Sequence, residues 1–335
     1  METPVQIVVT PGSGDGHAFG LARHLRRGLQ AQGYAASLLV FRELPQLRQW
    51  TRTCEATFSY LVAIGGDATL SEAAAAAVRL SVPFVPVPSG FGNLFTSVFE
   101  HPREPDDVVE LLGRGDLVWA DLGATRNRMF LSHESFGLLA RVQQTVERIR
   151  RHPRQRYVRL LAYYRTAARR LRETSLDSIQ VEIDGQLVAD RAALVTIANV
   201  ETYRGFLSLT PAASPLDGFF DVCVVPRTTG TRVLAHLIKM MLEVSGCRED
   251  VGLYRGRRVR VRVNRGNPSD IRMVVGALPL LVPLGSVERL EARRAAAESK
   301  TPVVTLLPSE RGALDHAPGR ARVLRERSTP PVEVA

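Results

Sequence analysis

The sequence predicts an α/β domain built on a doubly wound parallel sheet, followed by a second domain of mostly antiparallel β-strands. Over roughly the first third of the chain, short apolar runs alternate with helical segments, which is typical of a parallel sheet covered by helices. From residue 179 onward the apolar runs show β-type alternation or β-branched composition instead. We therefore expect a first domain at residues 1–122, a β-rich domain at residues 123–294 and a largely disordered tail at residues 295–335.

The first domain is expected to contain four parallel strands with helices between them. The strands are predicted at residues 5–10, 36–41, 58–64 and 84–87. Helices are predicted at residues 18–32, ended by Gly33, and at the alanine-rich residues 70–80. Glycine-containing turns follow three of the strands, at residues 11–16, 65–66 and 88–93. Because ligands of such sheets bind at the carboxyl ends of the strands, these turns predict one shared binding site.

The turn after the third strand has the features of an anion site. Gly65 and Gly66 allow the backbone to approach a phosphate, and the free N–H groups of the following helix point toward it. The Thr69 hydroxyl is placed to cap the helix or to bind a phosphate oxygen. Asp67 repels a bare phosphate, so it suits a bridging Mg²⁺ or a proton-accepting role. The alternative is an ordinary strand-to-helix turn capped by Asp67 and Thr69, and the convergence of three turns argues against it.

The second domain is expected to be a mostly antiparallel β structure with one crossing helix. Strands are predicted at residues 179–183, 192–198, 219–225, 257–263 and 271–275. Asp184-Gly185 predicts a hairpin turn, and apolar residues at helical spacing predict a helix at residues 232–244. Residues 301–307 are predicted to add one edge strand, with disorder beyond Pro308.

The composition and the short motifs of the chain exclude several classes of protein. The formal net charge of +10 favours anionic partners, namely nucleotides, nucleic acid or acidic membrane surfaces. No apolar run approaches the ~18 residues of a membrane span, the N-terminal residues do not read as a signal peptide, and three well-separated cysteines indicate a reduced, cytoplasmic compartment. A Walker loop is excluded because neither lysine follows a glycine, and no Gly-x-Ser-x-Gly elbow of a hydrolase occurs.

A series of short motifs runs through both domains. Residues 65–72 read Gly-Gly-Asp-Ala-Thr-Leu-Ser-Glu. The downstream motifs are Asn199, Tyr203-Arg204-Gly205, Thr210-Pro211-Ala212-Ala213 and Asp217-Gly218-Phe219-Phe220-Asp221-Val222. The first resembles the GGDGT-L-N-E signature of the diacylglycerol kinase catalytic domain, of which NAD kinases share the GGDGT element. The downstream series resembles the N, GGG, P-x-A and DG-x-LDV series of lipid kinases, which NAD kinases lack. The turns at residues 11–14 and 88–93 resemble the NP-x-SG and P-x-GT-x-N turns of the same family, and the resemblance spans about residues 5–290.

This resemblance implies a nucleotide-binding α/β domain followed by a β-sandwich, with the active site between them. The implied activity is that of an ATP-dependent lipid kinase, which transfers the γ-phosphate of ATP, with Mg²⁺, to a hydroxyl of a diacylglycerol-type or sphingoid/ceramide-type lipid. The implied nucleotide site consists of Ser13, Gly14, Gly65, Gly66, Asp67, Ala68, Thr69, Ser71, Glu72, Gly90 and Asn93. The implied divalent-cation site consists of Asp217 with carbonyl groups near Ser214 and Phe219.

The chain departs from the family pattern at five positions of the expected active site. Ala68 stands where the family has glycine, and its Cβ is expected to narrow the phosphate loop. Phe91 and Phe41 replace threonines that contact the nucleotide in relatives. Val275 and Ala277 replace the carboxylates of a V-D-G-E turn whose glutamate is assigned as general base. Asp67 is then the best remaining candidate base, and the alternative hypothesis is a catalytically silent relative that binds lipid or nucleotide.

Residues 141–172 hold eleven arginines and one acidic residue, Glu147. The first interpretation is a helix packed on the β domain with a solvated basic face. The second is docking on an anionic membrane, where each arginine adds ~1 kcal/mol, and the lipid-kinase resemblance favours it. Nucleic-acid binding is the third, and no recognition motif supports it. We therefore expect a lipid substrate at an anionic membrane surface, a nucleotide, no nucleic-acid partner, a peripheral membrane location and compatibility with a homodimer.

Overall fold

The computed structural model describes residues 3–11, 17–55, 57–90, 93–137, 140, 177–201, 209–227, 251–299 and 305–306. The predictions for residues 12–16, Phe91, the arginine-rich segment 141–172 and the helix at 232–244 lie outside the described residues. None of the described helices is both long enough and apolar enough to cross a membrane.

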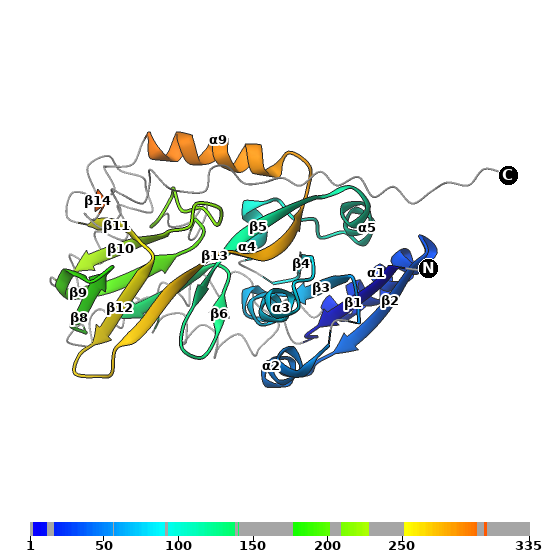
Figure 1. Cartoon of the computed structure of the whole chain (residues 1–335), viewed down its shortest axis with the longest axis horizontal. Coiled ribbons are helices and arrows are strands. Elements are labelled where there is room, and N and C mark those ends of the chain that lie inside the picture. Colours follow the sequence, from blue (N-terminus) through cyan, green and yellow to red (C-terminus); the bar gives the residue numbers. More distant parts are fainter. Residues whose placement is uncertain are drawn as a thin grey trace.

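The first part of the chain alternates strands and helices, as predicted (Figure 1). Its elements are β1 (Thr3–Val9), α1 (Ala18–Ala31), β2 (Tyr34–Val40), α2 (Leu44–Thr53), β3 (Tyr60–Gly65), α3 (Asp67–Leu80), β4 (Phe84–Pro88), α4 (Leu94–Val98) and α5 (Pro105–Arg114). The strands pair in the order β2-β1-β3-β4, and all of these pairs are parallel. The doubly wound parallel sheet is therefore confirmed.

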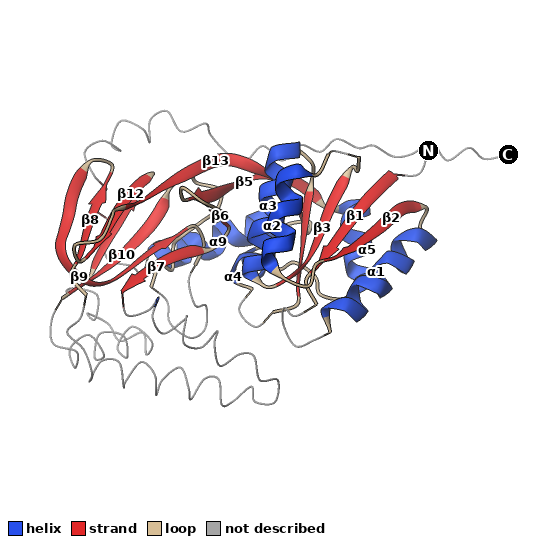
Figure 2. Ribbon diagram, turned by 90° about the horizontal axis from the view of Figure 1, so that it is seen from below, coloured by secondary structure: helices blue, strands red, loops and turns tan. Residues whose placement is uncertain are grey.

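Helices cover both faces of this sheet because the strand side chains alternate between two apolar clusters. On one face Ile7, Val62 and Val85 pack with residues of α1 and α5. On the other face Val8 and Ala63 pack with residues of α2 and α3. Figure 2 shows α2 and α3 on one side of the strands and α1 and α5 on the other. Burial on both faces explains why the strands read as nearly continuous apolar runs.

The second part is a β-sandwich domain. Its elements are β5 (Asp116–Ala124), β6 (Met129–Phe130), β7 (His133–Gly137), β8 (Ile179–Ile183), β9 (Gln186–Ala198), β10 (Phe220–Pro226), β11 (Gly252–Gly256), β12 (Arg258–Val263), β13 (Ser269–Val282), α9 (Ser286–Glu298) and β14 (Thr305–Leu306). Strand β9 pairs antiparallel with β7, β8 and β10. The hairpin between β8 and β9 turns at Asp184 and Gly185, whose φ angles of 47° and 84° match the expected primed turn.

Strand β13 is much longer than the predicted strand at residues 271–275, and it joins the two domains. Its first half pairs with β12, with Arg272 opposite Arg258. On its other edge it pairs antiparallel with β5 from Arg272 to Val282, and it meets β4 at Leu280, opposite Phe84. The chain therefore returns to the first domain after the second is formed, as Figure 1 shows. The pairing of β5 with β13 shifts register between Val274 and Leu278, around Gly276, which has a φ of 54°.

Two described elements include residues of the predicted tail at 295–335. Helix α9 extends through residue 298, and β14 pairs parallel with β11, which confirms the predicted edge strand at residues 305–306. The elements not anticipated from the sequence are α2, α4, α5, β5, β6, β7, β11 and α9.

Candidate active site

Two glycine turns cross at the carboxyl edge of the parallel sheet. Ser89, after β4, donates its backbone N–H to the carbonyl of Gly65, after β3, at 3.0 Å. A Cβ added to Gly90 would lie 2.9 Å from the Cα of Gly66. This contact requires glycine, because backbone atoms fill the space that a side chain would occupy. Two of the three predicted turns therefore meet at one edge, and they present backbone rather than side chains to an incoming group.

Helix α3 begins directly behind this crossing, three residues earlier than predicted. Gly66 is its N-cap, with an extended backbone, and the N–H of Leu70 makes a bond to the Gly66 carbonyl at 3.0 Å. The preceding N–H groups of the first turn point along the helix axis toward the crossing, where an anion is favoured. Ala68 lies in this first turn, exposed and in the helical conformation, so its Cβ causes no backbone strain.

The structure gives Thr69 a packing role rather than the predicted capping role. Its side chain is buried, and a Cβ added to Gly65 would lie 2.5 Å from the Thr69 Cβ. Gly65 is therefore the residue that admits the threonine side chain. No side-chain cap hydrogen bond forms at the start of α3, because Thr69 lies within the helix.

Asp67 and Asn93 link the crossing to α4. The Asp67 Oδ2 accepts the backbone N–H of Leu94 at 3.4 Å, so this half-buried carboxylate lies between the starts of two helices. Asn93 is buried with a φ of 47°, and its Nδ2 donates to the carbonyl of Gly90. Asn93 thereby closes the turn that contains Gly90. The Asn93 Oδ1 is buried and has no hydrogen-bond partner among the residues that the structure describes.

Ser71 and Glu72, which the resemblance placed in the nucleotide site, hold α3 in position. The Ser71 Oγ accepts the N–H of Leu131 at 3.2 Å, which fixes α3 to the beginning of the second domain. Glu72 is buried and accepts a hydrogen bond from the Arg48 Nε at 2.9 Å, which fixes α3 to α2. Both side chains are thus engaged away from the glycine crossing.

Phe41, where relatives have a threonine, belongs to an aromatic group beside α2. Its ring centroid lies 5.7 Å from that of Trp50, which stacks in turn on Phe58 at 6.4 Å. At this position the chain therefore presents an apolar surface where the resemblance implies a threonine hydroxyl.

Asp121 of β5, which no sequence motif indicated, connects the two domains at this edge. It is buried, and its two carboxylate oxygens accept the N–H groups of Gly218 and Gly276, each at 2.7 Å. Asn199 supports it by donating to the carbonyls of Asp121 and Leu131, at 2.9 and 2.8 Å. Burial raises the pKa of Asp121 to about 6, which the two N–H hydrogen bonds and a nearby arginine charge partly oppose.

The turn around Gly276 carries no carboxylate of its own. Val275 is 49% exposed, and Ala277 packs partly buried against the core. Asp121 reaches this turn from the neighbouring strand, so the nearest carboxylate comes from a different element. Of the two glutamates that could have replaced the missing base, Glu72 is paired as described above. Glu134 forms an ion pair with Arg128 at 2.5 Å, and burial raises its pKa.

Asp217, the expected metal ligand, faces arginines instead. Its Oδ2 lies 2.9 Å from Arg294 of α9 and 3.9 Å from Arg255 of β11, while its Oδ1 accepts the N–H of Phe219 at 3.0 Å. Burial raises the pKa of Asp217 to about 7, together with the charge of Asp221, and the two arginines oppose the shift.

These contacts do not fit a divalent cation at Asp217, because guanidinium groups already supply the positive charge. Ser214, the second member of the expected site, is buried and lies three residues before Asp217 in the sequence. Within the described part of the chain, no group of three or more His, Cys, Asp or Glu side chains is arranged to hold a metal ion.

Two family models match consecutive parts of the chain. The diacylglycerol kinase catalytic domain matches residues 4–125, and the YegS C-terminal NAD kinase beta sandwich-like domain matches residues 132–280. The gap between the two matches, residues 126–131, follows β5 and includes β6.

Curated relatives and a solved structure agree with this assignment. A diacylglycerol kinase of Staphylococcus saprophyticus is 25% identical over 56% of this chain and 61% of its own length. An uncharacterised protein of Synechocystis is 27% identical over 55% of this chain and 42% of its own length. The chain thus matches less than two thirds of the length of either relative. A diacylglycerol kinase from Bacillus anthracis has the same fold, with a TM-score of 0.63 at 17% identity over 84% of this chain and 98% of the other. With both domains matched in order, this chain belongs to the diacylglycerol kinase-like superfamily.

Proposed function

We propose that this protein is an ATP-dependent lipid kinase that transfers the γ-phosphate of ATP to a hydroxyl of a lipid of the diacylglycerol or sphingoid/ceramide type. The observation that carries the proposal is the backbone contact between Gly66 and Gly90 at the start of α3. It creates a side-chain-free surface at the helix N-terminus, which suits the phosphates of a nucleotide. The family match to both domains supports the same activity.

In this proposal, the chain contributes mainly position and charge. The first-turn N–H groups of α3 bind phosphate oxygens, and Asp67 lies beside them to hold Mg²⁺ or to accept the hydroxyl proton. A nucleotide-bound Mg²⁺ would neutralise charge on the transferred phosphoryl group. Asp121 acts as a positioning residue, because it fixes the turns at Gly218 and Gly276 against the first domain. The acceptor lipid would then approach from the second domain.

One observation favours a second function. The turn around Gly276 offers Val275 and Ala277 where relatives have carboxylates. A protein that binds nucleotide or lipid without transferring phosphate would tolerate this change. Loss of a general base typically costs ~10²–10⁴-fold in rate, so residual activity is compatible with the kinase proposal.

The two functions are separated by measuring ATP binding and ATP consumption with a panel of lipids. For the kinase, lipid-dependent consumption should fall by ~10²-fold or more in Asp67→Ala. Asp190→Ala is a matched control, because this carboxylate is exposed on β9, in the second domain. ATP binding without consumption on any lipid would establish the silent binder, and equal consumption by the two variants would contradict the role of Asp67.

We further propose that the protein acts in the cytoplasm at the surface of an anionic membrane, because its acceptor is a lipid and its net charge is +10. Sedimentation with anionic and neutral vesicles at two salt concentrations tests this. Salt-sensitive preference for anionic vesicles is expected, and equal binding to both kinds would contradict it.

A further inference from the structure

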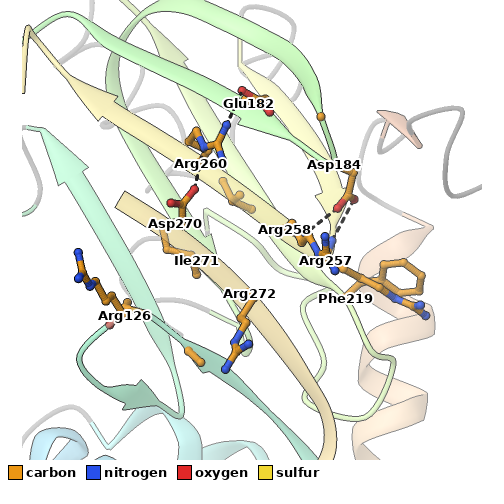
Figure 3. A pocket seen from close by; sticks show the side chains of 14 residues that line it. Arg126, Glu182, Asp184, Phe219, Arg257, Arg258, Arg260, Asp270, Ile271 and Arg272 are labelled. Carbon is orange, nitrogen blue, oxygen red and sulfur yellow. Dashed lines mark hydrogen bonds and ion pairs between the residues drawn. The ribbon is translucent and has the colours of Figure 1, made fainter. Parts of the chain in front are cut away.

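A cavity of about 920 Å³ opens over exposed residues of β12 and β13, and no residue of the glycine crossing lines it (Figure 3). Five arginines line it: Arg126, Arg257, Arg258, Arg260 and Arg272. Three carboxylates also line it: Glu182, Asp184 and Asp270. Because arginines outnumber carboxylates in this lining, the ion pairs decide which arginines have no acidic partner.

Glu182 and Asp270 are engaged at one end of the cavity, and Asp184 is engaged at the other. Arg260 lies between Asp270, at 2.7 Å, and Glu182, at 3.7 Å. The two oxygens of Asp184 accept the backbone N–H groups of Arg257 and Arg258, at 3.0 and 2.9 Å. These acidic groups therefore neutralise Arg260 and shape the β8–β9 turn, and they leave the other arginine side chains unpaired with acid.

Like charges face one another at the other end. Arg258 and Arg272 are directly opposite in the pairing of β12 with β13, and both are exposed. Arg272 is also opposite Ala124 of β5, and Arg126 follows two residues later. Among the described residues, no acidic side chain forms an ion pair with Arg126, Arg258 or Arg272. Like charges directly opposite on a sheet are destabilising, so this arrangement favours a bound anion between them.

A fourth guanidinium forms the inner wall of the cavity. Arg257 stacks over the Phe219 ring at 4.5 Å and donates from its Nε to the Gly218 carbonyl at 3.3 Å. A Cβ placed on Gly218 would lie 3.7 Å from the Arg257 Nη2 and 3.5 Å from the Val275 Cγ1. Arg257 therefore connects the cavity to Gly218, which lies beside the exposed Val275.

Guanidinium groups bind phosphate through paired hydrogen bonds, and a phosphate monoester carries about −1.5 to −2 charges at neutral pH. We propose that this cavity holds the phosphate monoester headgroup of an anionic phospholipid, between Arg126, Arg258 and Arg272. The choice of a lipid source rests on the proposed function and on the exposed Val275, which lies beside Gly218, the residue that Arg257 contacts. The site is distinct from the glycine crossing, so one protein would hold an anionic lipid and a nucleotide together.

The test uses vesicle binding without nucleotide. Wild-type protein should bind vesicles containing phosphatidic acid at least about tenfold more tightly than vesicles of phosphatidylcholine alone. Arg272→Glu places a carboxylate opposite Arg258, so the melting temperature should rise while binding to phosphatidic acid falls about tenfold or more. Arg262→Glu is the matched control, because it makes the same charge change on the outward face of β12, outside the cavity lining. Its binding should remain within about twofold of wild type.

Several results would overturn the proposal. Equal binding of phosphatidic acid vesicles by Arg272→Glu and Arg262→Glu would remove the site. Binding of soluble glycerol phosphate as tight as that of the vesicles would assign the cavity to a free phosphate ester and overturn the lipid source. If Arg272→Glu does not fold, Arg126→Ala in the β5–β6 connection serves instead, with the same expected loss of binding. Because no ATP is present, failure of the kinase proposal leaves these outcomes unchanged and is measured separately by ATP consumption.

Discussion

The contact between Gly66 and Gly90 allows a quantitative test of the phosphate surface. In Gly90→Ala the new Cβ would lie 2.9 Å from the Gly66 Cα and 3.1 Å from the Asn93 Oδ1. The first distance is roughly 0.6–1.1 Å shorter than the ~3.5–4.0 Å optimum for two carbon atoms. Since the nearest atom belongs to the backbone, the two turns must separate by a comparable amount. Overpacking of this kind costs about 1–3 kcal/mol of stability.

A displacement of ~1 Å in a catalytic geometry typically costs ~10²-fold in rate. We therefore expect Gly90→Ala to lower kcat/KM for ATP by roughly 10–100-fold and to weaken nucleotide binding. The matched control is Gly20→Ala in α1, where an added Cβ meets no atom within 4 Å. That change should raise stability by about 0.5–1 kcal/mol and leave activity unchanged.

The assays are isothermal titration with ATP and lipid-dependent ATP consumption, each with thermal unfolding to confirm folding. If Gly90→Ala is folded and its ATP affinity and kcat/KM stay within about threefold of Gly20→Ala, the crossing of the two turns does not form the phosphate surface.

Three further predictions concern groups around the interdomain edge. Burial raises the folded-state pKa of Asp121 to about 6, above its unfolded value. This group should therefore contribute stability that is present below about pH 4 and lost as the pH rises to about 6. Chemical denaturation of Asp121→Asn across this range should show a flatter pH dependence than that of the wild-type protein, and an unchanged profile would contradict the assignment. Arg294→Ala should lower the free energy of unfolding by about 3 kcal/mol, because it removes a partner of the buried Asp217. Asp217→Asn should leave any effect of Mg²⁺ on the melting temperature unchanged, and a Mg²⁺-dependent stabilisation that this variant abolishes would show that a cation site exists there after all. Restoring carboxylates by Val275→Asp with Ala277→Glu should raise a weak kinase activity by ~10-fold or more, and a double variant that binds ATP and lipid without any gain would show that the turn is not the site of the general base.

The first domain could be predicted well because the sequence patterns that determine its strands and turns are local. β1, β3 and β4 are short apolar runs covered on both faces, and each glycine turn directly follows its strand. Gly65, Gly66 and Gly90 were therefore found without knowledge of the fold. The start of α3 was placed three residues late because Asp67, Ala68 and Thr69 read as part of the turn, whereas the extended Gly66 already caps the helix.

The connection between the domains could not be predicted because its contacts are distant in sequence. Asp121 binds N–H groups that lie 97 and 155 residues further along the chain. The only local signal was a carboxylate within an otherwise apolar strand, which requires a buried partner. Strand β13 was predicted only in its first part, because the bulge at Gly276 interrupts the pattern of apolar residues.

The arginine partners of Asp217 could not be predicted for a similar reason. Asp217 was assigned from the motif, but its partner Arg294 belongs to α9, a helix that sequence analysis did not anticipate. The juxtaposition of Arg258 and Arg272 likewise could not be predicted, because it depends on the register of β12 with β13.

The central claim is that this protein transfers phosphate to a lipid. Its most direct test is incubation with ATP labelled in the γ-phosphate and mixed vesicles that contain diacylglycerol, sphingosine and ceramide, followed by separation of the lipid products. We expect label in one lipid phosphate, reduced ~10²-fold or more in Asp67→Ala and ~10-fold or more in Gly90→Ala, and retained in Gly20→Ala. Label that stays entirely in ATP, with nucleotide and vesicles both bound, would contradict it.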